Sequence, residues 1–297
     1  MPAVELNNIC KSYNDNLVVN NVSFTVAQGE IFGLIGPNGA GKTTTIRMVM
    51  DITKPDSGEI NVLGESLSED TKNRIGYLPE ERGLYKKLTV LESLTYLASL
   101  KGIKPRLVNS RAEGLLERVG MLPHKEKKIE ELSRGMGQII QFLVTIIHGP
   151  QLVVLDEPFA GLDPVNTELL KEIILELRNQ GKAIILSTHM MNEVEALCDR
   201  ILMIDKGRTI LYGELAEIKL RYRNNSIFLE FDGMLGEIEG VVGKRDYGTY
   251  VELFLDEETP PQKILEQLVS RGVNVNRFEV STPSLNDIFL QLVGKEQ

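Results

Sequence analysis

The residues best suited to chemistry in this sequence form one glycine-rich loop, Gly36-Pro37-Asn38-Gly39-Ala40-Gly41-Lys42-Thr43-Thr44, between an apolar run and a helical pattern. Glycines at this spacing let consecutive backbone N–H groups curl around an oxyanion. Lys42 can then reach the β- and γ-phosphates of a nucleoside triphosphate, and the Thr43 hydroxyl can ligate Mg²⁺. The loop therefore predicts a phosphate site formed by Gly36, Asn38, Gly39, Ala40, Gly41, Lys42, Thr43 and Thr44.

An acid pair follows the apolar run Leu152-Val153-Val154-Leu155. Asp156 is placed to hold Mg²⁺ through water, and Glu157 to orient or deprotonate an attacking water. Two acids at this point can also be no more than a solvated strand end, but the phosphate loop favours the catalytic interpretation. Pro158 turns the chain away and leaves the acids at the carboxyl end of the strand, where α/β sheets bind ligands.

The segment Leu132-Ser133-Arg134-Gly135-Met136 begins a helical pattern. Ser133 is a favoured N-cap residue, which is a sufficient structural reason for it. A helix N-terminus also presents N–H groups and positive partial charge, so Ser133 and Gly135 suit a phosphate equally well.

Two further polar residues stand at the ends of elements. Asp163 precedes Pro164, which makes a good helix start by itself. His189 closes the apolar strand that ends in Ser187-Thr188. A lone histidine is more often a packing or surface residue, so its role depends on the elements that accompany it.

In this order along the chain, the phosphate loop, the Leu-Ser-x-Gly segment, the Asp-Glu strand end, the Asp163 loop and the strand-end histidine resemble the ATPase subunits of ABC transporters. The resemblance covers about residues 1–221. It implies a P-loop NTPase domain that binds ATP and Mg²⁺ and hydrolyses ATP. Lys42, Glu157 and His189 are then catalytic, with His189 contacting the γ-phosphate.

The same resemblance implies a second copy of the chain as partner and an aromatic contact with the adenine ring. In these ATPases a second copy of the chain completes an ATP sandwich, so Ser133 and Gly135 would contact the γ-phosphate held by the other copy. Asp163 would take part in communication between the copies. Tyr13 lies where the family carries an aromatic residue that stacks on adenine, although a tyrosine among polar residues is equally compatible with a surface position.

The sequence departs from the family pattern at three positions. Arg134 takes the place of the first glycine of the signature, a change that related subunits commonly tolerate. Met136 replaces a glutamine of the signature, which removes a polar side chain near the nucleotide. Glu80 stands where most members have glutamine, and its carboxylate ligates Mg²⁺ at least as well. The expected metal ligands are therefore Thr43, Glu80 and Asp156. Residues 77–85 and 283–289 resemble an exporter-type subgroup that includes sodium-efflux and daunorubicin-export ATPases.

These residues need an α/β framework to position them. Short apolar runs alternate with helical patterns from Val4 to about Leu220, which predicts a mostly parallel central sheet. Early strands at 22–26, 31–35 and 60–63 suggest an antiparallel subdomain beside it. A helical insertion is expected from about Thr89 to Gly149, starting with a capping box of Thr89 and Glu92.

The pattern changes after Leu220. Strands are expected at 227–231, 250–255 and 273–280, with a helix at 261–271 and a last helix capped by Ser284. We therefore divide the chain into an ABC ATPase domain, 1–221, and a small C-terminal α+β domain, 222–297.

The composition indicates which kinds of partner and which cellular compartment to expect. The 297 residues carry a formal charge of −9 from 33 basic and 42 acidic side chains, which disfavours nucleic acid as a ligand. Cys10 and Cys198 have no metal-type spacing, which suits incidental thiols in a reducing compartment. No apolar run is long enough to cross a membrane. The expected location is the cytoplasm, peripheral to the inner membrane through a permease.

The sequence thus predicts the ATP-binding and ATP-hydrolysing subunit of an ABC exporter, working with separate integral membrane permease subunits. Two other functions remain open. A soluble ABC protein that acts on ribosomes or DNA would need a second cassette or a long coiled coil, and an ATP-gated scaffold would not need Glu157. The transported substance lies outside what this chain encodes.

Overall fold

The computed structural model describes residues 1–81, 83–223, 225–233 and 235–293, so Arg82 within the 77–85 segment lies outside the described residues. The chain divides into two compact units, Met1–Leu215 and Ala216–Gln297. The division falls at the start of helix α8 (Leu215–Arg221), whereas the sequence placed a boundary after that helix.

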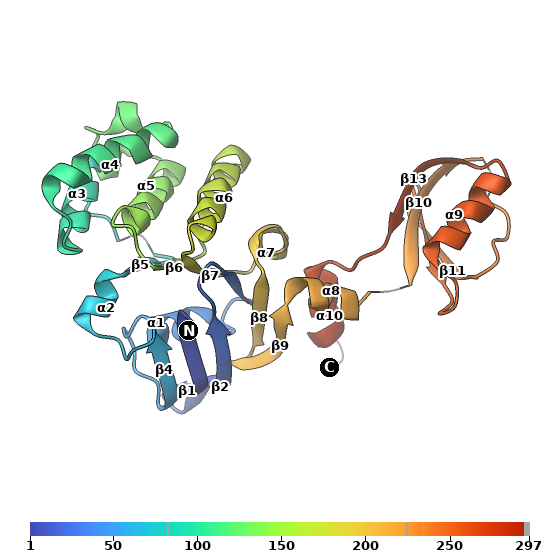
Figure 1. The fold of residues 1–297 in the computed structure, drawn as a ribbon, viewed down its shortest axis with the longest axis horizontal. Coiled ribbons are helices and arrows are strands. Elements are labelled where there is room, and N and C mark those ends of the chain that lie inside the picture. Colours follow the sequence, from blue (N-terminus) through green and yellow to red (C-terminus); the bar gives the residue numbers. More distant parts are fainter. Residues whose placement is uncertain (82, 224, 234, 294–297) are drawn as a thin grey trace. The chain divides into compact units, whose positions relative to one another are not determined.

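The first unit is built on a six-stranded sheet in the order β5-β6-β7-β3-β8-β9 (Figure 1). The strands are β5 (Ile75–Leu78), β6 (Leu152–Asp156), β7 (Ala183–Thr188), β3 (Ile31–Ile35), β8 (Arg200–Asp205) and β9 (Arg208–Glu214). All neighbours pair in parallel except β8 and β9. Every residue of β3, β6 and β7 is buried, as expected for parallel strands covered on both faces. The mostly parallel α/β fold is confirmed.

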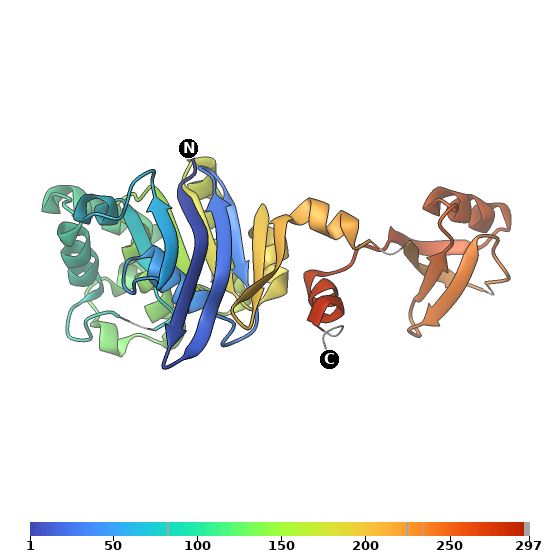
Figure 2. The same cartoon turned by 90° about the horizontal axis from the view of Figure 1, so that it is seen from below.

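A second sheet in this unit is antiparallel, in the order β2-β1-β4 (Figure 2, blue strands). It contains β1 (Val4–Tyr13), β2 (Asn16–Val26) and β4 (Ser57–Val62). Helix α1 (Lys42–Val49) shares one apolar cluster with residues of both sheets. The prediction that residues 31–35 belong to this subdomain is wrong, because β3 pairs with β7 and β8 at the centre of the main sheet.

The helical insertion is confirmed and contains α3 (Val90–Leu100), α4 (Pro105–Arg118) and α5 (Arg134–Ile146), with short turns at Leu122–His124 and Ile129–Glu131 (Figure 1, green). Its capping box forms as predicted: the Thr89 N–H donates to the Glu92 carboxylate at 2.8 Å and the Glu92 N–H donates to the Thr89 hydroxyl at 3.1 Å. The remaining helices of this unit are α2 (Glu69–Asn73), α6 (Pro164–Asn179) and α7 (Met191–Leu197).

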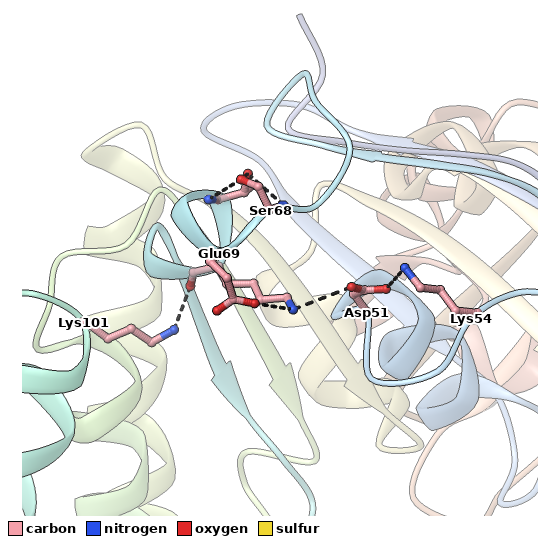
Figure 3. A network of polar contacts seen from close by, with 7 residues as sticks. Asp51, Lys54, Ser68, Glu69 and Lys101 are labelled. Atoms are coloured by element: carbon pink, nitrogen blue, oxygen red, sulfur yellow. Dashed lines mark hydrogen bonds and ion pairs between the residues drawn. The ribbon is translucent and has the colours of Figure 1, made fainter.

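A polar network ties α2 to its neighbours (Figure 3). The Lys72 ammonium lies 3.0 Å from the Glu69 carboxylate and 3.6 Å from that of Asp51. Lys101, at the end of α3, donates to the Lys72 carbonyl at 2.7 Å. Because exposed ion pairs contribute little each, we take this network as fixing where α2 and α3 meet rather than as a large stabilising force.

The second unit has a four-stranded antiparallel sheet in the order β11-β12-β10-β13. Its elements are β10 (Ser226–Asp232), β11 (Val241–Asp246), β12 (Val251–Leu255), α9 (Pro261–Ser270), β13 (Asn274–Val280) and α10 (Leu285–Val293). The sheet and α9 share an apolar core of their own, which includes Ile227, Leu253 and Ile264. The sequence analysis missed β11, because most of its residues are exposed and half are charged, so they give no apolar alternation. The expected cap of the last helix forms, with the Asp287 N–H donating to the Ser284 hydroxyl at 3.1 Å.

Among the described residues, no helix combines the length and the apolar character needed to cross a bilayer.

Candidate nucleotide site

The glycine-rich loop joins the end of β3 to the start of α1, at the middle of the parallel sheet. Two of its glycines are required by close backbone approach. A Cβ on Gly36, at φ 151°, would lie 2.1 Å from the Ile204 carbonyl oxygen, and a Cβ on Gly41, at φ 107°, would lie 2.7 Å from the Val18 carbonyl oxygen. The loop therefore keeps its tight curve and its inward N–H groups only with glycine at these positions.

Lys42 lies inside this curve. Its side chain is buried, and Nζ donates to the carbonyl oxygens of Gly36 at 2.8 Å and Pro37 at 3.1 Å. Burial lowers the pKa of Lys42, and the nearby carboxylates, Glu157 first, oppose that shift. The ammonium is thus held over the loop by carbonyl groups that a phosphate oxygen can replace.

The loop and the acids line one cavity of about 420 Å³. Its lining residues are Val18, Asn38, Gly39, Gly41, Lys42, Thr43, Thr44, Glu80, Asp156 and Glu157. Sequence reasoning missed Val18, which lies on β2 and carries no polar signal. Ala40 is buried beneath the loop rather than in the cavity lining, and Gly36 contributes its carbonyl to Lys42.

Asp156 is the most unusual member of this cavity. Its side chain is fully buried, and neither carboxylate oxygen has a hydrogen-bond partner among the described residues. Burial raises its pKa, and the neighbouring Ser187 and Thr43 hydroxyls oppose the shift only in part. A buried carboxylate without a partner costs free energy unless a cation or donor joins it. Asp156 beside Thr43 therefore fits Mg²⁺.

The donor set also suits this metal. Within the described residues, no group of three or more His, Cys, Asp or Glu side chains is arranged to hold a metal by itself. Mg²⁺ usually takes one or two carboxylates and fills its other positions with water and substrate phosphates. Glu80 lines the same cavity and can supply a second carboxylate.

Glu157 is held from two sides at the ends of β6 and β7. Its Oε2 accepts a hydrogen bond from the Thr188 hydroxyl at 3.0 Å, and its Oε1 accepts one from the His189 N–H at 3.1 Å. The His189 ring nitrogen Nδ1 lies 2.8 Å from the same Oε1. Glu157 also has a left-handed backbone, φ 50°, which a non-glycine residue adopts at a cost of about 1–3 kcal/mol. The sequence did not predict the role of Thr188.

Besides Gly36 and Ala40, four predicted residues are not among those that line the cavity: His189, Ser133, Gly135 and Tyr13. The His189 side chain is 54% exposed and meets the site through Glu157. The Ser133 hydroxyl caps α5 by accepting from the Met136 N–H at 3.3 Å. Gly135 approaches the Asp163 loop, since a Cβ there would lie 3.5 Å from the Gly161 carbonyl oxygen. The signature therefore lies against the residues just before Asp163, and Ser133, Gly135 and Asp163 are not among the residues that line the cavity.

Asp163 and Tyr13 both make contacts within their own chain. The Asp163 carboxylate accepts from the Asn166 N–H at 3.0 Å and caps α6. Tyr13 is 44% exposed, and the Lys11 ammonium lies 5.6 Å from its ring centroid. The exposed ring leaves a face for stacking but is not part of the cavity lining.

Comparison with known proteins gives two family matches. Residues 19–160 match the family described as ABC transporter, and residues 213–293 match the C-terminal domain described as ATP-binding protein DrrA1-3-like. The second match agrees with the exporter-type resemblance of the sequence.

Individual relatives and a solved structure agree with these family matches. The chain is 39% identical to the uncharacterized ABC transporter ATP-binding protein YhaQ of Bacillus subtilis (strain 168), over 97% of this chain and 98% of that protein. It is 37% identical to Nod factor export ATP-binding protein I of Rhizobium sp. (strain N33), over 99% and 98%. It is similar to a solved ATP-binding subunit of an ABC transporter, with a TM-score of 0.70 and 31% identity over 74% of this chain and 93% of that one.

Proposed function

This chain belongs to the ATP-binding proteins of ABC transporters, which hydrolyse ATP, and we propose that it powers an exporter through separate membrane permease subunits. One observation carries the assignment of chemistry: the phosphate loop, the unpaired Asp156 and the held Glu157 line a single cavity. Export is supported by the match of residues 213–293 and by a relative named for Nod factor export.

The proposed reaction is attack of water on the γ-phosphorus of ATP. A bond forms from the water oxygen to phosphorus, the bond to the β,γ-bridging oxygen breaks, and ADP and phosphate leave. Glu157 orients the water and accepts its proton, and His189 fixes the Glu157 carboxylate and contacts the γ-phosphate. Lys42 and the loop N–H groups hold the phosphates. Mg²⁺, held by Thr43, Asp156 and Glu80, would supply charge neutralisation.

A second copy of the chain completes the site in this proposal. Ser133 and Gly135 stand at the N-terminus of α5, which presents positive partial charge and N–H groups. Their place outside the cavity of their own chain supports a contact with the γ-phosphate held by the other copy.

The permease is proposed to dock on the helical insertion. A largely apolar groove of about 760 Å³ lies there, lined by Tyr85, Lys87, Leu88, Thr89, Leu91, Glu92, Thr95, Tyr96, Ser99, Asn109 and Glu126. Tyr85 and Tyr96 meet edge to face at 5.6 Å and are 53% and 43% exposed, so both rings are available to a partner. We propose that a short cytosolic helix of the permease fills this groove, which would place the chain on the cytosolic side of the membrane.

Turnover tests this function directly. Mg²⁺-dependent release of phosphate from ATP by the purified chain, stimulated by a permease encoded next to it, is the expected result. ATP binding without turnover would instead favour an ATP-gated scaffold.

We expect Glu80→Ala to raise the Mg²⁺ concentration for half-maximal turnover about tenfold, because a carboxylate near the metal is lost. Metal-free ATP binding should stay at the wild-type level, since the phosphate loop is intact. A Mg²⁺ titration of phosphate release measures the half-maximal Mg²⁺ concentration. Binding of fluorescent ATP in EDTA measures the metal-free affinity. Glu81→Ala, which removes the exposed neighbouring acid, is the control. Coinciding titrations of wild type and Glu80→Ala would place Glu80 away from the metal.

The C-terminal unit offers a second test. Its sheet and α9 share an apolar core. Helical spacing predicts packing for four apolar residues of α10, and two of them, Leu285 and Ile288, are buried, whereas Phe289 and Leu292 are half-buried. We propose that this unit also pairs with the same unit of a second copy. A chain ending at Arg221 should then bind MgATP normally but lose nucleotide-free association. Sedimentation of both chains without ATP measures this, and equal association would leave the unit only its packing role.

A further inference from the structure

Helix α5 carries polar side chains where burial would favour apolar ones. Gln141 and Thr145 lie within a helix whose middle is almost entirely buried, and Gln141 is only 4% exposed. A buried amide costs free energy unless its groups are hydrogen-bonded. The partners of these side chains therefore explain why they are there.

Their partners are carbonyl groups at the edge of the central sheet. β5 is an edge strand, and the Arg74 carbonyl just before it accepts from the Gln151 N–H on the β6 side. Carbonyls alternate in direction along a strand, so those of Ile75 and Tyr77 point away from β6, and Pro79 follows directly after β5. An unpaired edge of this kind needs cover.

Helix α5 and the turn after it supply that cover as a ladder. His148 Nε2 lies 3.1 Å from the Ile75 carbonyl oxygen. The Thr145 hydroxyl lies 2.9 Å from the Gln141 carbonyl oxygen of its own helix and 3.4 Å from that of Tyr77, so its contact with β5 is the weaker of the two. The Gln141 amide donates to the Pro79 carbonyl at 3.3 Å. Gln141 and Thr145 lie four residues apart on one face of α5, and His148 follows in the turn after the helix.

The two backbones are also in direct contact. A Cβ on Gly76 would lie 2.2 Å from the Thr145 carbonyl oxygen, so only glycine lets α5 approach β5 this closely. Burial lowers the pKa of His148 to about 4, which keeps its ring neutral between the two elements. The segment that ends at Glu80 is thus fixed against α5 along its length.

Gln141 differs from the other members of the ladder. Its amide nitrogen also donates to the Glu81 carbonyl at 3.2 Å, so one side chain holds the residues on both sides of Glu80. Its own oxygen has no hydrogen-bond partner among the described residues, which is a cost that a purely structural position would avoid. Glu80 itself lines the nucleotide cavity with Thr43 and Asp156.

We propose that Gln141 is the positioning residue for Glu80, and that it makes the position of Glu80 depend on α5. The helix that begins with the signature residues then also places a carboxylate beside the phosphate loop. This inference rests on the proposed role of Glu80 at the metal, and it adds the residue that holds Glu80 there.

The test replaces Gln141 by methionine, which has a similar length and lacks both N–H donors. Mg²⁺ is titrated into the full chain with a non-hydrolysable ATP analogue, and the rise in melting temperature reports metal binding without turnover. We expect Gln141→Met to raise the half-saturating Mg²⁺ on the order of tenfold, as loss of a residue that orients a metal ligand does. Thr145→Val, which removes the hydroxyl that contacts the Tyr77 and Gln141 carbonyls and leaves the Gln141 amide in place, should titrate like wild type.

Further measurements separate positioning from general damage. Analogue binding in EDTA should be equal in all variants, and amide hydrogen exchange of residues 77, 78, 80 and 81 should rise in Gln141→Met alone. A loss of metal-free binding that parallels the loss of Mg²⁺ binding, or the same loss in Thr145→Val, would overturn the proposal. If Glu80→Ala shifts the Mg²⁺ titration and Gln141→Met does not, the role of Gln141 is wrong while that of Glu80 stands. If neither shifts it, the role of Glu80 fails as well.

Discussion

Glu157→Gln lowers turnover by a factor on the order of a hundred or more while ATP still binds. The amide keeps the size of the carboxylate and can still meet Thr188 and the His189 N–H, but it no longer takes a proton from water. Because the loop and Lys42 are untouched, the ATP concentration for half-saturation stays near the wild-type value. ATP that cannot be cleaved then keeps two copies together.

Phosphate release and size-exclusion chromatography with light scattering measure the two effects. Glu168→Gln removes an exposed acid on α6 and serves as the charge-matched control, with wild-type turnover expected. Wild-type turnover in Glu157→Gln would show that another residue orients the water. Loss of ATP binding would show that the carboxylate shapes the loop instead.

Gly36→Ala lowers ATP affinity on the order of a hundredfold or abolishes binding. The added methyl carbon would lie 2.1 Å from the Ile204 carbonyl oxygen, far inside contact distance, so the loop or β8 must shift. A displacement of about 1 Å in a binding loop is enough for an effect of this size. Fluorescent-ATP titration, together with the melting temperature, measures it.

Gly181→Ala is the matched control. Gly181 also has a positive φ, 80°, but among the described residues no atom beyond its chain neighbours lies within 4 Å of the point where an added methyl carbon would stand, so it carries only the backbone cost of roughly 1–2 kcal/mol. Gly181→Ala should have a lower melting temperature than wild type and bind ATP with wild-type affinity. Equal ATP affinity in Gly36→Ala and wild type would mean that the loop tolerates displacement and that its N–H groups do not fix the phosphates.

Local signals made most of the site predictable. The loop needs glycine for its backbone conformation, and Asp156 and Glu157 follow a run of apolar residues that only a buried strand explains. The carboxyl ends of parallel strands meet at one edge, so these residues converge without any knowledge of the strand order. Glu80 was found differently, through the family resemblance, as the residue at a position where most members carry glutamine, and the structure places it just after β5.

The features that could not be predicted from the sequence are those that depend on which elements become neighbours in the fold. The apolar run of β3 fits either sheet, and only its pairing with β7 and β8 places it centrally. Val18 enters the cavity because β2 passes close to the loop, and Gln141 matters because α5 lies along the edge of β5. Neither residue type signals a nucleotide site by itself.

The central position of β3 also constrains how the chain is made. The ribosome delivers the phosphate loop early, but the two strands on either side of β3 come from residues 183–188 and 200–205. Pairing across so many residues is slow, because the intervening chain must be closed into a loop first. Until then the wholly apolar β3 has no partner on either side and is prone to aggregate. Nascent chains that end before β8 should therefore need chaperones. Added nucleotide should not protect such chains from aggregation.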